Sequence, residues 1–439
     1  MLQKQQEEPT ALKQGEELFE SWEILQKKLA IDLESTAREA KAIQRKREIS
    51  NAADLLRLIL FYATSDWSLR LVGAWAFLSG IGFLSDVAVL KRLRNSKIWL
   101  GKLVVIIMQK RISVLKNLPG VRLRVVDATT ISIPGSKGID WRIHLSFDLG
   151  NLCLDGVEIT DKYGGESLSR FEAQNNEILV ADGAYPFISG MIPALNAGAG
   201  LIVRINWRNV PVLGPDGQRV EIIPWLKTIT TLSEKLVWMK SPQGWCQFRL
   251  IASPLPPDKA EEARRRARLR HQRKQQPLNE NTLLAAGFVL LLTNLPAETW
   301  TGCLVLALYR MRWQIELYIK RLKSVLNFDH LRAKNPRVAQ TYLLAKLLIA
   351  FMVEELTNRA NLLYPDWFDA LERPVSIYRT TALFYEAFRQ SIAGSWAAYL
   401  KQFFTFLRRY LCDAPRDRPQ QLAWARAFIT QTSMSGTFP

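Results

Sequence analysis

A row of polar side chains between positions 304 and 323 could hold a metal ion and bind phosphate. On a helix, at about 100° per residue, the carboxylate of Glu316 would lie close to four further polar residues: Tyr309, Arg312, Lys320 and Lys323. An apolar stripe at helical spacing runs beside this row, formed by Leu304, Leu308, Met311, Ile315 and Leu322. We therefore expect one helix that packs its stripe on a core and points its polar row into a groove. The alternative is a surface helix with ion pairs such as Arg312–Glu316.

Two aspartates upstream could complete a carboxylate site. Asp127 follows the alternating stretch VRLRVV, and Asp182 follows the apolar stretch ILVA. Both stretches predict short β-strands, so each Asp is expected at a strand end that opens into a shared cleft. Gly183 permits a close approach of backbone or ligand there. Three carboxylates without His or Cys suit Mg²⁺ or Mn²⁺, and two such ions could clamp a phosphodiester.

The composition indicates a polyanionic partner. Lys and Arg number 59 against 41 Asp and Glu, which gives a net charge of +18. Nucleic acid is the simplest such partner, although basic proteins of membrane surfaces share this balance. Apolar stretches are too short, too broken or too charged to predict a membrane span. The first residues lack the apolar core of a signal peptide. The scattered Cys and His argue against a disulfide framework and a zinc site, so we expect a cytoplasmic protein.

Residues 1–118 are predicted to be helical. Within them, the segment Gly82–Lys97 has a Gly-Ser-Asp turn in which Ser85 or Asp86 can cap a helix. That helix carries three basic residues suited to a DNA groove: Lys91, Arg92 and Arg94. The segment is therefore interpreted as a helix-turn-helix unit, with an ordinary helical bundle and a solvated basic face as the alternative.

The rest of the chain predicts an α+β protein. In 119–206 we expect three strands, a helix over 165–175 and two further strands, which resembles the opening of a ribonuclease-H-like mixed sheet flanked by helices. A mostly β insertion with its own small sheet is expected at 207–287, ending in an arginine run at 264–274. That run is either a clamp for DNA phosphates or a solvated linker. Residues 288–372 return to the core with a strand and the polar-row helix, and 373–439 form a helical C-terminal region.

The motifs resemble those of the insertion sequence 4 family of bacterial DDE transposases. Tyr309, Arg312, Glu316 and Lys323 match its Y-x2-R-x3-E-x6-K signature in identity and spacing. Its first Asp lies in a D-[GA]-T-T context, as Asp127 does, and its second in D-[GA]-x-[YF], as Asp182 does. The family also places a mostly β insertion between the second Asp and the Glu. The resemblance covers roughly residues 120–330.

This resemblance implies a Mg²⁺-dependent DNA transposase with two ions per site, for which Mn²⁺ can substitute. Asp127, Asp182 and Glu316 would hold the ions, while Tyr309, Arg312 and Lys323 would position the phosphate beside Trp313. An aromatic residue would stack a flipped base, with the candidates left open: Trp225, Trp238, Trp245, Phe288 and Trp300. The partners would be double-stranded DNA, as element ends and target, and a second copy of the chain in the synaptic complex. Neither a membrane nor a small-molecule cofactor is expected, and the protein would lie on the nucleoid when bound.

Two other functions remain open from the sequence. A DNA-binding regulator could have kept the fold and lost catalysis, although a binder needs no cluster of negative charge facing DNA. A ribonuclease-H-like nuclease would cut DNA without joining it.

Overall fold

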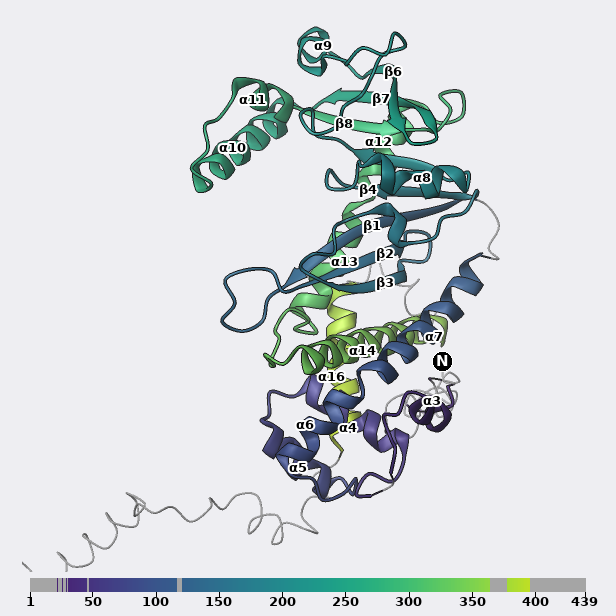
Figure 1. Ribbon diagram of the computed structural model, residues 1–439, viewed down its shortest axis with the longest axis vertical. Coiled ribbons are helices and arrows are strands. Elements are labelled where there is room, and N and C mark those ends of the chain that lie inside the picture. The colour runs from purple at the N-terminus through teal and green to yellow at the C-terminus, as the bar shows by residue number, and fades with distance from the viewer. Residues whose placement is uncertain are drawn as a thin grey trace, which may run out of the picture.

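The fold is one mixed β-sheet standing on a body of helices (Figure 1). The computed structural model describes residues 22, 26, 29, 31–45, 47–116, 121–363 and 377–394. Within them the sheet has eight strands in the order β3-β2-β1-β4-β5-β8-β7-β6. Their bounds are β1 Arg122–Ile131, β2 Trp141–Asp148, β3 Cys153–Asp161, β4 Glu177–Ala181, β5 Gly200–Arg204, β6 Ser233–Ser241, β7 Gly244–Pro254 and β8 Phe288–Thr293.

The first five strands confirm the predicted ribonuclease-H-like arrangement. β1, β2 and β3 pair antiparallel, and β4 and β5 follow parallel to β1. The helix predicted over 165–175 is wrong, because only a 3-10 turn, η1, forms at Leu168–Arg170. There the Ser167 side chain accepts a hydrogen bond from the backbone of Ser169, a local bond that competes with helix formation. The helix lies instead between β4 and β5, as α8, Ile188–Asn196.

β1 does not end near Asp127 as expected. It continues to Ile131, because antiparallel pairing with β2 extends to the Ile131–Trp141 pair. Parallel pairing with β4 stops earlier, at the Val126–Ala181 pair. Asp127 therefore lies inside β1, at the level where its β4 neighbour ends.

The insertion at 207–287 is not mostly β, and it forms no separate sheet. β6 and β7 extend the main sheet through β8, which pairs with β5 on its other side. Helices take up more of the insertion than strands do: α9 Ile222–Thr228, α10 Pro257–Arg273 and α11 Glu280–Ala286. The arginine run lies in α10, whose Glu, Ala and Arg are good helix formers and whose Pro lies in the first turn.

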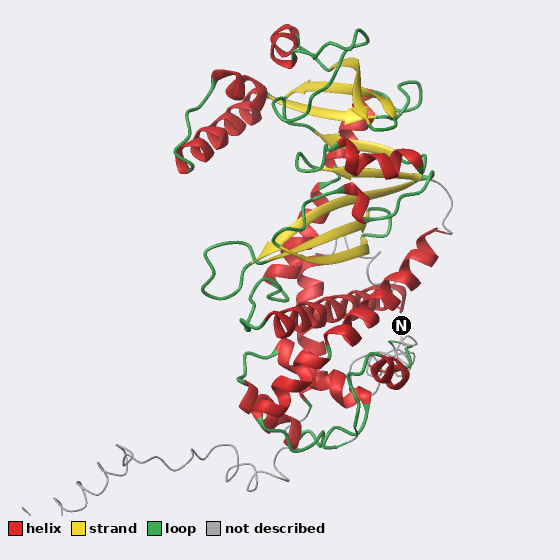
Figure 2. Cartoon of the chain, viewed as in Figure 1, coloured by secondary structure: helices red, strands yellow, loops and turns green. Residues whose placement is uncertain are grey.

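The two faces of the sheet belong to two hydrophobic cores. Val125, Val180 and Ile202 point into the core shared with the helical body, whereas Val126, Ala181 and Val203 point into a core covered by α8, α9 and α11. This alternation follows the two-residue period of strands, and it explains why the central strands are apolar throughout. Figure 2 shows the helical body below the strands and further helices lying against the sheet and at its upper margin.

The helical body combines N-terminal and C-terminal segments. α14 (Pro336–Leu363) packs against α4 (Ala52–Thr64), α6 (Asp86–Asn95), α7 (Lys97–Lys116) and α16 (Ile377–Ala393). The Thr341 hydroxyl of α14 donates to the Leu93 carbonyl of α6 at 2.8 Å. Part of α14, Pro336–Glu355, is long and apolar enough to cross a membrane, but 78% of its most apolar window is buried inside the protein, as in a core helix. The predicted helical termini are confirmed where described, by α3 Leu33–Glu39, α4 Ala52–Thr64, α5 Leu69–Leu78, α6 Asp86–Asn95, α7 Lys97–Lys116, α14 Pro336–Leu363 and α16 Ile377–Ala393.

Candidate active site

The single helix predicted over residues 304–323, which carries the polar row, is two helices in the structure. α12 runs over Gly302–Arg310 and α13 over Trp313–Ser324. At the joint the hydrogen bonds tighten to the third residue back: Arg312 donates to the Tyr309 carbonyl at 3.0 Å, and Ile315 to that of Arg312 at 3.2 Å. The backbone of Arg312 stays right-handed helical, so the chain runs on with Arg312 at the joint.

Packing explains the break. The predicted stripe is wrong in part, because Leu304 and Met311 are 39% and 44% exposed. The buried residues are Val305, Leu306 and Tyr309 of α12 and Ile315, Tyr318 and Leu322 of α13. On a continuous helix these two sets would lie more than about a quarter-turn apart. The joint lets both helices bury their own apolar face.

Two adjacent strands place the two aspartates side by side. Because Val126 pairs with Ala181 in parallel register, Asp127 and Asp182 are the next residues on neighbouring strands. Asp127 accepts a hydrogen bond from the Ala128 backbone at 2.8 Å, and Asp182 one from that of Ala184 at 2.9 Å. The pKa of Asp127 is raised to about 6, mainly by burial and also by the negative charges of Asp182 and Glu316, while the Ala128 hydrogen bond and Arg312 act in the opposite direction. Asp182 and Glu316 therefore both lie near enough to Asp127 for their charges to act on it.

The Arg312 side chain joins two of these carboxylates. Its Nη1 donates to Asp127 Oδ2 at 3.4 Å, and its Nη2 donates to Glu316 Oε1. Its guanidinium carbon lies 5.8 Å from the centre of the Tyr309 ring, and 16% of its side chain is exposed. One cation thus partly neutralises carboxylates that come from a strand and a helix.

The other predicted phosphate ligands form no hydrogen bond or ion pair with the carboxylates in the described parts of the chain. Tyr309 is buried, and its hydroxyl has no hydrogen-bond partner among the described residues. Trp313 is 57% exposed, next to Arg312 in the chain. Lys320 is exposed and Lys323 half-buried, and neither forms an ion pair within the described parts of the chain. The structure thus brings together Asp127, Asp182, Glu316 and Arg312, and neither lysine pairs with these carboxylates.

The predicted DNA-binding helix forms as α6 but lies in the helical body, far from the carboxylates (Figure 1). Ser85 rather than Asp86 is its cap, accepting from the Ala88 backbone. Lys91 and Arg94 are exposed and Arg92 is half-buried, while Val89 and Leu93 are fully buried. The helix therefore presents a basic outer face on an apolar inner one.

Tyr185 belongs to the site and was missed from the sequence. Its side chain is 1% exposed, and its hydroxyl has no hydrogen-bond partner among the described residues. Burial raises the pKa of Tyr185 far above its ordinary value, and the charges of Asp127, Glu166 and Asp182 act in the same direction. The hydroxyl is therefore neutral, and it lies near enough to both aspartates for their charges to act on it. Its signal in the sequence was its place in the Asp182-Gly183-Ala184-Tyr185 motif.

A buried charge network fixes the strands beneath the aspartates, and it too was missed. Arg122 forms ion pairs with Asp148, Asp155 and Glu177 at 3.1, 2.8 and 2.5 Å. Arg124 forms ion pairs with Asp155 and Glu177 at 2.7 and 2.6 Å. All five side chains are nearly inaccessible, and they come from β1, β2, β3 and β4. The network thus links the strands whose register sets Asp127 beside Asp182.

The three carboxylates Asp127, Asp182 and Glu316 are ligands of the type that a divalent cation prefers. Hard ions such as Mg²⁺ and Mn²⁺ prefer carboxylate oxygens, and a bound cation would offset the repulsion of Asp127 by Asp182 and Glu316. Within the described residues, however, no group of three or more His, Cys, Asp or Glu side chains is close enough to hold a metal ion. Arg312 occupies the position between Asp127 and Glu316 in this conformation. Binding of a metal by all three carboxylates therefore requires Arg312 to move.

Comparison with known proteins gives a consistent picture. The transposase DDE domain matches residues 119–352, which include all three carboxylates. The putative transposase InsL of insertion sequence element IS186A from Escherichia coli K12 is 40% identical over 333 residues, which is 74% of this chain and 90% of that protein. The transposase of IS421 from Escherichia coli is 40% identical over 334 residues, with the same coverage.

The chain is also similar to more distant proteins, in sequence or in structure. The transposase of IS231F from Bacillus thuringiensis subsp. israelensis is 24% identical over 368 residues, 73% of this chain and 76% of that protein. Among solved structures, a piggyBac transposase synaptic complex with hairpin DNA covers 93% of this chain and 86% of its own, with 11% identity and a TM-score of 0.42. A structural overlap of that size adds no argument about this site.

Proposed function

The chain belongs to the DDE transposases of bacterial insertion sequences, and from this premise we propose which of its residues cut and join DNA. It is a DNA transposase, an enzyme that cleaves DNA and transfers it, and enzymes with a DDE domain depend on divalent metal ions. The regulator and nuclease alternatives are therefore set aside. The proposal concerns the metal ligands, the identity and number of the ions, the phosphate ligands and the oligomeric state.

Asp127, Asp182 and Glu316 are proposed as the catalytic metal ligands, holding two Mg²⁺ ions, or Mn²⁺ in their place. The observation that carries this is the register of β1 and β4, which sets the two aspartates on adjacent strands, with Arg312 linking Asp127 to Glu316. The bound ions would supply the charge that activates water and stabilises the attacking and leaving oxygens. The rest of the chemistry falls to residues of this chain.

Arg312, Lys323 and Tyr309 are proposed to position the scissile phosphate, with Lys320 and Trp313 contacting DNA beside it. Water attacks the phosphodiester at the element end, forming one P–O bond and breaking another, which releases a 3′-hydroxyl. That hydroxyl then attacks a phosphodiester of the target and displaces its 3′-oxygen. A guanidinium and an ammonium group beside the phosphate stabilise the negative charge that builds up in both steps.

DNA is the partner of this protein, in keeping with its family. We further propose that Lys91, Arg92 and Arg94 of α6 bind element ends and that two copies of the chain hold two ends in one complex. The division into 1–118, 119–206, 207–287, 288–372 and 373–439 is kept as a proposal, with the qualification that α14 packs into the helical body. The site of action is proposed to be the nucleoid in the cytoplasm.

The test is to remove one carboxylate charge at a time. Asp127→Asn, Asp182→Asn and Glu316→Gln keep size and hydrogen-bonding capacity, and each should abolish nicking and joining of end duplexes with Mg²⁺ or Mn²⁺. End binding should persist, because a negative charge near the phosphates has been removed. Asp161→Asn, an exposed strand-end residue outside the site, is the matched control. Nicking by any of the three variants at the parental rate would refute the assignment of that ligand.

A further inference from the structure

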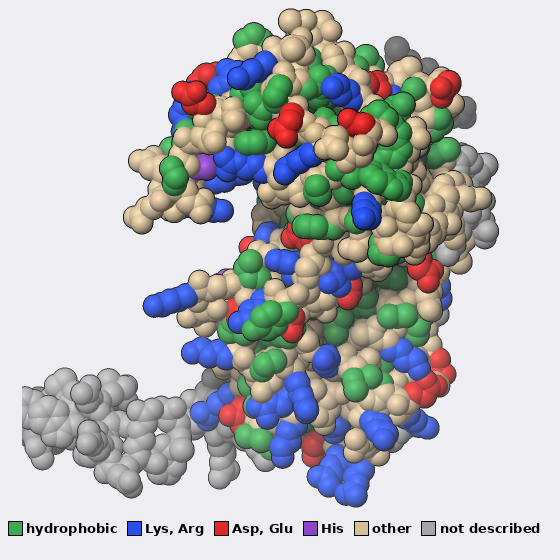
Figure 3. Space-filling model, turned by 45° about the horizontal axis from the view of Figure 1, so that its top comes forward, with side chains coloured by type: hydrophobic (Ala, Val, Ile, Leu, Met, Phe, Trp, Pro, Cys, Tyr) green, Lys and Arg blue, Asp and Glu red, His purple; other side chains and the backbone are tan. Residues whose placement is uncertain are grey.

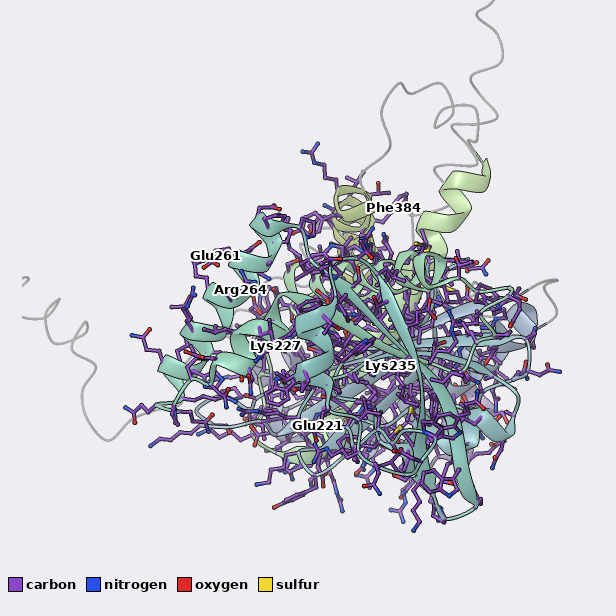
Figure 4. All side chains as sticks on the ribbon, turned by 90° about the horizontal axis from the view of Figure 1, so that it is seen from above. Glu221, Lys227, Lys235, Glu261, Arg264 and Phe384 are labelled. Carbon is purple, nitrogen blue, oxygen red and sulfur yellow. The ribbon has the colours of Figure 1, made fainter. Side chains whose placement is uncertain are left out.

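Helix α10 forms an arm rich in arginine at the margin of the molecule. It packs against α11, and Ala260 is its one fully buried residue. Seen from above, Glu261 and Arg264 of this helix lie at the periphery, away from the strands (Figure 4). Over Pro257–Arg273 it has seven Lys or Arg against three Asp or Glu, a net charge of +4.

Its arginines fall into two groups. Arg264, Arg266 and Arg268 form ion pairs with Glu261 or Glu262 on the same helix. Arg265, Arg270 and Arg273 are exposed, and they form no ion pair within the described parts of the chain. Arg265, Arg270 and Arg273 can therefore bind an anionic partner without losing an ion pair of the described protein.

The sheet topology places the arm at the edge that carries the carboxylates. β4 and β5 run parallel, β8 runs antiparallel to β5, and β7 runs antiparallel to β8. β7 therefore ends at the same edge as β4, directly after which Asp182 stands. With strands about 4.8 Å apart, the three steps from β4 to β7 amount to roughly 14 Å across the sheet. β7 continues to Pro254, three residues beyond the level of Asp182, and α10 begins shortly after it.

A hollow separates the arm from the body below it. Figure 3 shows it, with Lys and Arg side chains on its upper and lower sides. α10 has 17 residues, hence a length of about 25 Å at 1.5 Å per residue. At about 3.4 Å per base pair, that length matches roughly seven base pairs of duplex.

We propose that α10 binds the phosphate backbone of the DNA duplex that lies across the carboxylate edge, through Arg265, Arg270 and Arg273, whatever its base sequence. The inference rests on the proposed active site, because it takes its DNA path from the position of Asp182. Phosphates carry no sequence information, so the arm would hold element ends and unrelated DNA equally.

The experiment compares the parent with R265Q/R270Q/R273Q and with R265K/R270K/R273K. Gln and Lys are both good helix formers, so circular dichroism should show α10 intact in both variants. Binding to an end duplex and to a random duplex of equal length is measured by fluorescence anisotropy between 50 and 300 mM NaCl. The salt slope is the steepness with which the logarithm of the binding constant falls as the logarithm of the salt concentration rises, and each lost phosphate contact lowers it by about 0.9. The Gln variant should therefore lose up to about 2.7 in slope on both duplexes, while the Lys variant keeps the parental slope.

The outcomes separate the arm from the active site. An unchanged salt slope in the Gln variant, with a parent that nicks end duplexes, would overturn the arm proposal and leave the active site intact. Loss of affinity for the end duplex alone would also overturn it, because the arm would then read sequence. A parent that binds DNA through the arm but never nicks with Mg²⁺ or Mn²⁺ would refute the proposed catalytic residues and not the arm.

Discussion

Arg312 donates a hydrogen bond of 3.4 Å to Asp127, a residue 185 positions away in the chain. The same guanidinium also donates to Glu316, so the joint between α12 and α13 is tied to strand β1. The carboxylate site is therefore held together by a cation of the protein itself. A metal ion bound at the proposed site would compete with Arg312 for these oxygens.

Arg312→Gln should strengthen metal binding to the DNA-free protein. The variant removes a positive charge next to Asp127 and Glu316, and unit charges about 4 Å apart interact by about 1 to 4 kcal/mol between water and the protein surface. We expect roughly tenfold tighter Mn²⁺ binding by calorimetry or electron paramagnetic resonance. Arg310→Gln, at an exposed position two residues earlier, is the control. Equal Mn²⁺ affinity in all three proteins would mean that Arg312 does not compete.

Lys323→Ala should slow the reaction without affecting the metal site. Lys323 contacts none of the carboxylates, so Mn²⁺ affinity should match that of the parent. A scissile phosphate misplaced by about 1 Å can cost on the order of a hundredfold in rate, which single-turnover nicking would measure. Lys334→Ala, at an exposed position beyond α13, should react at the parental rate. A parental rate in Lys323→Ala would remove this residue from the phosphate site.

Replacement of Lys91, Arg92 and Arg94 by Ala should weaken binding to element ends. The two exposed side chains on α6, Lys91 and Arg94, would each lose a phosphate contact, and the salt slope should fall by about 0.9 for each. Anisotropy titrations at several salt concentrations measure both effects. If affinity and slope stay at the parental values, end recognition lies on another surface.

Arg124→Met should destabilise the fold. It removes one of the two arginine partners of Asp155 and Glu177, both about 1% exposed, and leaves Arg122 alone with the buried carboxylates. Removing one partner of a buried ion pair costs about 3 to 5 kcal/mol. Urea unfolding followed by circular dichroism should show a lower midpoint. Arg38→Met breaks an exposed pair with Glu34, which contributes about 0 to 1 kcal/mol, and should unfold near the parental midpoint. Equal midpoints for both variants would show that the buried network contributes little.

Lys346→Met should change how stability depends on pH. Lys346 is 2% exposed, and its Nζ donates to the Leu326 carbonyl. Burial lowers its pKa from 10.5 to about 7. Between these pH values the unfolded chain binds a proton that the folded chain lacks, so the free energy of unfolding rises with pH, by up to about 1.4 kcal/mol per unit. Urea midpoints from pH 7 to 9.5 should show this rise in the parent and in exposed Lys334→Met, and a flatter profile in Lys346→Met.

Much of the fold could be predicted from local patterns. The period of two in residues 121–131 and the apolar run before Asp182 predicted β1 and β4, and the Ser85-Asp86 turn predicted the start of α6. These features depend on residues near one another in the chain, and for that reason local sequence patterns predict them. For the arginine run the sequence left a DNA clamp and a solvated linker open, and in the structure this run lies in helix α10.

By itself the sequence determined the identities and the order of the three carboxylates and of the Tyr-Arg-Glu-Lys motif, because motif spacing is a property of the chain alone. Only the tertiary structure decided that β6 and β7 join the main sheet, since an alternating strand shows which side is buried but not which strand it pairs with. The tertiary structure also decided that the helix breaks at Met311–Arg312, where two helices bury different faces. No Pro or Gly at this point indicates the break in the sequence. The contacts of Arg312 with Asp127 and of Arg124 with Glu177 arise from strand register and helix docking, and these depend on packing between segments far apart in the chain.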